Sequence, residues 1–104
     1  MTRIKKLADE LKDELCSAKE YAEEYLTMKA KSSQSENYGR FAKYYDEMAH
    51  QELQHAAYLH EIVVSEIEEL SKVYTPPEDM MKKWDSDHRE YIEKAAWIRQ
   101  MLAM

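Results

Sequence analysis

The chain has 104 residues, which is enough for one domain with a modest core. Its formal net charge of −6 disfavours nucleic acid or an anionic membrane as a partner. It contains no run of roughly eighteen apolar residues that could span a bilayer, and its charged N-terminal segment lacks the apolar stretch of a signal peptide. Cys16 is the only cysteine, which excludes an intrachain disulfide and favours a reducing, cytoplasmic location.

The first predicted element is a helix over about residues 3–31. One Gly and two Pro in the whole chain, with many Glu, Lys, Ala, Leu and Met, are typical of an all-α protein. Thr2 is a candidate N-cap for this helix. Its expected apolar stripe consists of Ile4, Leu7, Leu11, Ala18, Tyr21, Tyr25 and Met28.

The second and third predicted helices cover about residues 34–74 and 78–103. Ser33 followed by Glu36 matches a capping box, and Pro76 and Pro77 separate the two helices. The expected stripe of the second helix is Phe41, Tyr45, Met48, Leu59, Val63, Leu70 and Val73. That of the third is Met81, Trp84, His88, Tyr91, Ala95, Ile98 and Leu102.

The length of the second helix predicts an oligomer. It would be roughly 60 Å long at 1.5 Å per residue. If both connections are tight hairpins, the first helix covers its N-terminal part and the third helix its C-terminal part. We therefore expect a second copy of the chain, most simply in a two-fold dimer that completes a four-helix bundle. The alternative is a monomeric three-helix bundle with a broken second helix.

Acid-x-x-His spacing occurs three times, at Glu47/His50, Glu52/His55 and Asp85/His88, where composition alone predicts roughly one match. On a helix, side chains three residues apart share a face and can bind one metal ion. Glu52 and His55 fall in the middle of the expected apolar stripe, whereas Glu47 and His50 fall on the opposite, solvent-facing side. Because a buried carboxylate is unfavourable unless it is paired, Glu52 indicates either a metal site or a structural pair with His55.

The first helix offers two carboxylates as a further metal ligand. Glu14 lies between Leu11 and Ala18 on the apolar stripe, and it is level with Glu52 if the turn centres near Ser33. Glu20 is level with Glu52 only if the turn centres near Glu36, and it points away from that stripe. In the third helix, His88 is expected to form a buried pair with Glu66 across the second connection, or to bind a second ion with it.

Residues 45–56, Tyr-Asp-Glu-Met-Ala-His-Gln-Glu-Leu-Gln-His-Ala, resemble the second helix of the ferritin-like superfamily. Rubrerythrins carry a similar aromatic-x-Glu-x-Ala-x-x-Glu-x-x-His-Ala run. The short chain with a single Glu-x-x-His hairpin and a trailing helix is similar to encapsulated ferritins. The resemblance implies metal ligands at Glu52 and His55. In the first helix, the chain separation between Glu20 and Glu52 is close to that usual in such sites, whereas Glu14 precedes Tyr21 at rubrerythrin-like spacing.

The resemblance also implies a function. Two subunits would build a di-iron site between them and oxidise Fe(II) with oxygen or peroxide, with manganese or another divalent metal as an alternative to iron. A protein shell would be a further partner, although the chain ends at Met104 without the extension typical of shell cargo. The competing hypothesis is a metal-free helical oligomerisation module in which Glu52 and His55 form a buried pair that fixes register.

Overall fold

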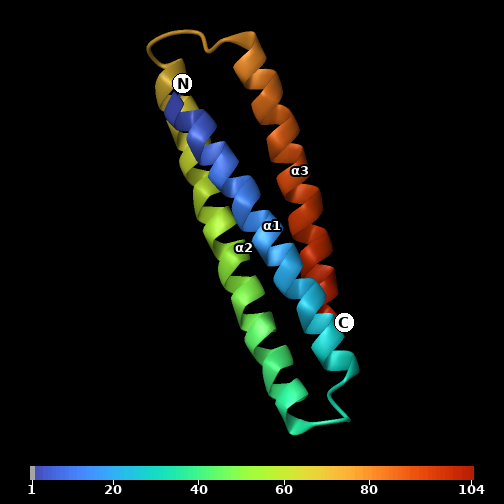
Figure 1. Cartoon of the computed structure of the whole chain (residues 1–104). Coiled ribbons are helices and arrows are strands. Elements are labelled where there is room, and N and C mark those ends of the chain that lie inside the picture. The colour runs from blue at the N-terminus through green and yellow to red at the C-terminus, as the bar shows by residue number, and fades with distance from the viewer. Residues whose placement is uncertain (1) are drawn as a thin grey trace.

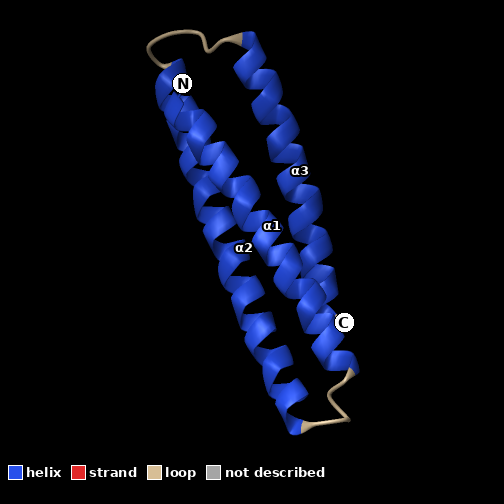
Figure 2. Cartoon of the chain, viewed as in Figure 1, coloured by secondary structure: helices blue, strands red, loops and turns tan. Residues whose placement is uncertain are grey.

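The computed structural model describes residues 2–104, and in this range the chain forms three long helices and no strand (Figure 1, Figure 2). The helices are α1 (Thr2–Ala30), α2 (Glu36–Ser71) and α3 (Glu78–Ala103). They lie along one axis in a rod that measures 59 × 17 × 16 Å. The predicted all-α class is confirmed.

The helix ends differ in detail from the prediction. Ser35, and not Ser33, caps α2: it is extended (φ −163°, ψ 141°), and its hydroxyl accepts a hydrogen bond from the Asn37 amide at 3.1 Å. Ser33 lies within the turn that precedes α2. Thr2, the other candidate cap, is already the first residue of α1. At its other end, α2 stops at Ser71, before the predicted residue 74.

The seam between α1 and α2 is lined by small and medium apolar residues. Along α1 the buried side chains are Ile4, Ala8, Leu11, Leu15, Ala18 and Ala22. Along α2 they are Ala42, Ala49, Leu53, Ala56, Val63 and Ile67. Arg3 at the start of α1 binds Glu66 near the end of α2 at 3.2 Å, so α1 covers almost the whole of α2. The prediction that the first helix covers only the N-terminal part of the second is therefore wrong.

The predicted apolar stripe of α2 is displaced from the seam. Of its members only Val63 is buried, whereas Phe41 is 37% exposed and Val73 is 78% exposed. The physical reason is that alanines, which hydrophobicity patterns weight lightly, let two helix backbones approach closely. The bulkier side chains then lie beside the seam on a face that we call the open flank, consisting of Phe41, Tyr44, Tyr45, Met48, Leu59 and Ile62.

Helix α3 packs mainly against α1 and touches α2 at few places, contrary to the prediction that it lies along α2. Lys12 of α1 binds Asp87 at 2.8 Å, and the Lys29 ammonium donates a hydrogen bond to the carbonyl oxygen of Met104. Both pairs are 75 residues apart in sequence, so α1 and α3 run parallel in a fixed register. The six residues between α2 and α3 form a connection long enough for α3 to cross from α2 to α1.

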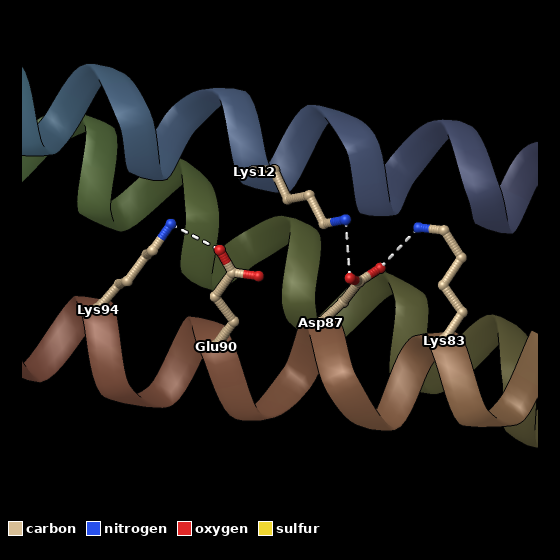
Figure 3. A network of polar contacts seen from close by, with 5 residues as sticks. All are labelled: Lys12, Lys83, Asp87, Glu90 and Lys94. Atoms are coloured by element: carbon tan, nitrogen blue, oxygen red, sulfur yellow. Dashed lines mark hydrogen bonds and ion pairs between the residues drawn. The ribbon is translucent and has the colours of Figure 1, made fainter.

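Asp87 is the only charged side chain that is buried among the described residues. One of its carboxylate oxygens binds Lys12, and the other binds Lys83 of α3 at 3.1 Å (Figure 3). The two ammonium groups come from different helices, since Lys12 extends from α1 and Lys83 from α3. This network neutralises the acid and joins α3 to α1.

Candidate metal centre

Three side chains from α1 and α2 converge half-way along the hairpin. His55 Nδ1 lies 3.5 Å from Glu52 Oε1 and 3.6 Å from Glu14 Oε2. Each of the three residues offers one potential ligand atom, and these atoms all lie within 4.8 Å of one another. Two carboxylates and one imidazole thus surround a point that a single metal ion could occupy.

The length of the α1–α2 turn selects Glu14 over Glu20. The connection covers residues 31–35, so it is centred on Ser33, and residues equally distant from Ser33 lie level with one another. Glu14 and Glu52 satisfy this condition. Glu20 lies almost two turns away from Glu14 and is exposed, with its carboxylate 3.8 Å from the thiol of Cys16. The structure therefore brings together Glu14, Glu52 and His55, and it leaves Glu20 outside the cluster.

The cluster carries an excess of negative charge. Hydrogen bonding to the Glu14 carboxyl, partial burial and the charge of Glu14 raise the pKa of Glu52 above its ordinary value, against the opposing influence of His55. Among residues 2–104, no lysine or arginine forms an ion pair with Glu14 or Glu52. The local charge balance therefore favours a bound proton or a bound cation.

The cluster is open on one side. The Glu14 and Glu52 side chains are 29% and 23% exposed, and that of His55 is 52% exposed. Glu52 and His55 project from the same side of α2 as the open flank. Toward the turn, a groove of about 280 Å³ continues this face and is lined by Met28, Phe41, Tyr44, Tyr45 and Met48. The potential ligand atoms thus lie within an apolar surface that α3 does not cover.

The other predicted acid–histidine pairs do not form sites. His50 is exposed and lies 3.4 Å from Asp46, in agreement with its predicted solvent-facing position. The predicted pair between Glu66 and His88 is wrong, because Glu66 binds Arg3 and His88 binds His60. The His60–His88 contact centres the second connection near Tyr74, so Glu66 is about one and a half turns out of register with His88.

His60 of α2 and Asp87 of α3 were not predicted from the sequence. His60 hydrogen-bonds to His88 at 2.6 Å and stacks on Tyr91, although no acid-x-x-His spacing marks it. Asp85 and Asp87 are the same residue type two positions apart, yet Asp85 is exposed and Asp87 is buried. The only signal for Asp87 is its position one turn after Trp84 on the apolar stripe of the third helix.

Comparison of the chain with models of protein families, with curated proteins and with solved structures gives no match. No helix in the described range 2–104 combines the length and the apolar character needed to cross a membrane. The Glu14–Glu52–His55 cluster and its surroundings are therefore the features of the described chain that bear on its function.

Proposed function

We propose that the chain is a ferritin-like metal-binding protein that holds iron at Glu14, Glu52 and His55 and oxidises Fe(II). The observation that carries this proposal is the convergence of two carboxylates and an imidazole from two helices, with no lysine or arginine of residues 2–104 paired to the carboxylates. Carboxylate oxygen and imidazole nitrogen suit Fe(II) and Mn(II), whereas a site for a softer ion would contain thiolates.

The residues of the cluster have separable roles. Glu14 supplies its carboxylate from α1, while Glu52 and His55 project from one face of α2, so a bound ion would link the two helices. Glu52 must release any proton that it shares with Glu14 before it can bind a metal ion. Metal binding would therefore become weaker as the pH falls. Bound iron would supply the redox chemistry: each Fe(II) gives up one electron, and two of them match the two-electron reduction of oxygen to peroxide or of peroxide to water.

A second copy of the chain would complete the site. Three protein ligands leave coordination positions free on the exposed side of the cluster, and the open flank surrounds that side with apolar side chains. Tyr44 is 48% exposed and Ile62 is 40% exposed, one on each side of Glu52 and His55 along α2. A two-fold dimer through this face would cover both regions and would place a second set of ligands opposite the first.

The metal-free oligomerisation module is the second candidate function. The 3.5 Å contact between Glu52 and His55 is its supporting observation, since the pair could fix register inside an interface. In this case Glu14 has no role and its carboxylate adds an unfavourable like charge. Metal binding therefore separates the two candidates.

Aerobic titration of the metal-free protein with Fe(II), followed by absorbance of the ferric-oxo bands, tests the proposed function. We expect saturable binding and oxidation faster than in buffer, with loss of both in Glu14→Gln. Glu20→Gln is the matched control, because it makes the same change on the same helix outside the cluster and should behave like the unmodified chain. If Fe(II) is neither bound nor oxidised faster than in buffer, the metal-binding proposal is wrong.

The proposed dimer has a separate test. Ile62→Arg places a charge on the open flank and should shift the protein to monomers in sedimentation velocity. Ile92→Arg is the control, since Ile92 is 51% exposed on α3, away from this flank. Equal sedimentation of the two variants would contradict the assignment of the open flank as the interface.

A further inference from the structure

A second titratable cluster lies where α3 meets α2. His60 Nε2 of α2 and His88 Nδ1 of α3 are 2.6 Å apart, and both rings are partly buried. Tyr91 stacks on His60 with a centroid separation of 4.6 Å, and Trp84 lies 5.5 Å from His60 and 6.0 Å from His88. Because α3 touches α2 at few places, this aromatic cluster is a principal attachment between the two helices.

The geometry of the pair limits the number of protons that it can hold. In the neutral pair, one ring donates its N–H to the unprotonated nitrogen of the other ring. One further proton can bind at an outward-facing nitrogen without disturbing this bond. When both rings are fully protonated, however, both facing nitrogens carry hydrogen, and two N–H groups cannot approach to 2.6 Å. The His60–His88 pair in contact therefore binds one proton fewer than the two separated rings.

Few other charges act on the pair. On α2 the residues one turn from His60 are Ala56, Ala57, Val63 and Val64, and the adjacent Glu61 is exposed. On α3 the rings of Trp84 and Tyr91 contact His60. Asp85, one turn before His88, is exposed, and the neighbouring Asp87 is already bound to Lys12 of α1 and Lys83. Burial, followed by the charge of His88, lowers the pKa of His60, which agrees with the geometric limit.

Few other contacts hold the N-terminal half of α3 against α2. A groove of about 410 Å³ separates it from the start of α1 and is lined in part by Ile4, Ala8, Met80 and Trp84. The ion pairs of Asp87 connect α3 to α1 and not to α2. The contact with α2 can therefore open while α3 remains attached to α1.

We propose that the His60–His88 contact is a pH-sensitive latch, which holds the N-terminal half of α3 against α2 and releases it when both rings become protonated. The open state binds one more proton than the closed state below the ordinary histidine pKa of about 6.5. The closed state is thus fully favoured above that pH. As the pH falls below it, the closed-to-open ratio decreases by at most about tenfold per pH unit for one proton.

Fluorescence of Trp84 tests the latch. Trp97→Phe leaves Trp84 as the only tryptophan, and Trp84 is 8% exposed in the closed state. With a chelator present, we expect its emission to shift to the red between pH 8 and pH 5, with a midpoint below 6.5. The shift should disappear when His88→Gln is added, because glutamine keeps a hydrogen-bonding group but cannot take up a proton. His50→Gln, which removes an exposed histidine of α2, should retain the shift.

Hydrogen exchange on the unmodified chain gives an independent test that does not depend on a variant folding. At pH 5 relative to pH 7.5, after correction for intrinsic rates, the loss of protection should be confined to residues 78–91. Equal loss along all three helices would overturn the proposal. So would an unchanged Trp84 emission, or a transition that survives His88→Gln.

Discussion

Glu52 and Asp87 are both acids that lie within apolar surfaces of long helices, but their neighbours differ in charge. Asp87 is 5% exposed and binds Lys12 and Lys83, so its charge is compensated within the chain. Glu52 is less buried, yet its neighbours are Glu14 and His55, and its pKa is raised. Burial alone therefore does not mark a metal site. The sign of the surrounding charge distinguishes an acid that stabilises the fold from one that has capacity for a cation.

The largest expected effect comes from Glu52→Gln. Loss of a carboxylate ligand should weaken Fe(II) or Mn(II) binding by about a hundredfold or more, because even outer partners of metal ligands contribute about 10- to 100-fold. In the metal-free protein the same change should raise the free energy of unfolding at pH 7, since it removes the repulsion between Glu52 and Glu14. Calorimetric metal titration and urea denaturation in a chelator measure the two effects.

Glu61→Gln is the matched control for Glu52→Gln, because Glu61 is an exposed acid on the same helix. It should leave both quantities near their original values. A Glu52→Gln protein that binds metal normally, or that is destabilised without metal, would support a structural role for the Glu52–His55 pair instead.

Asp87→Asn should have the next largest effect, and it should change stability without changing metal binding. The change removes two ion pairs, but the Lys12 and Lys83 side chains are 37% and 49% exposed and can regain water. We therefore expect the free energy of unfolding to fall by about 1–2 kcal/mol, with metal binding unchanged. Asp85→Asn, an exposed neighbour, should change it by less than about 0.5 kcal/mol. Equal effects of the two substitutions in urea denaturation would contradict the structural role of Asp87.

The smallest expected change in stability comes from making the Glu52 site resemble that of Asp87. His55→Lys places an ammonium group beside Glu14 and Glu52, where it can compensate their charge without a metal. We expect metal binding to be lost, while the free energy of unfolding stays constant or rises by roughly 0.5 kcal/mol. Retained metal affinity in this variant would show that the imidazole is not a ligand. His50→Lys is the control, since His50 lies outside the cluster.

The sequence predicted the helices and the pairing of Glu52 with His55, because both depend on local spacing, and it left Glu14 and Glu20 as alternatives for the first helix. Glu52 and His55 share a face wherever a helix forms, and Glu14 reaches them because the turn centres on Ser33. Whether Glu14 or Glu20 lies level with Glu52 depends on the length of the turn, which the hydrophobic periodicity does not encode.

The packing of α2 and α3 could not be predicted in the same way. Periodicity shows which residues share a face but not which helix covers that face. Alanines such as Ala49 and Ala56 form the buried seam of α2, while the bulkier Phe41 and Met48 lie beside it. The pairing of His60 with His88 depends on the path of a connection that contains no regular structure.

The parallel register of α1 and α3 has a consequence for the order of folding. Helices α1 and α2 are joined by five residues, so their pairing closes a short loop, whereas Lys12 and Asp87 meet only after 75 residues have been brought together. Each doubling of loop length costs only about 0.6 kcal/mol of closure entropy, but that entropy must be lost before the contact forms. We therefore expect the hairpin that carries Glu14, Glu52 and His55 to form early, and α3 to dock onto it last.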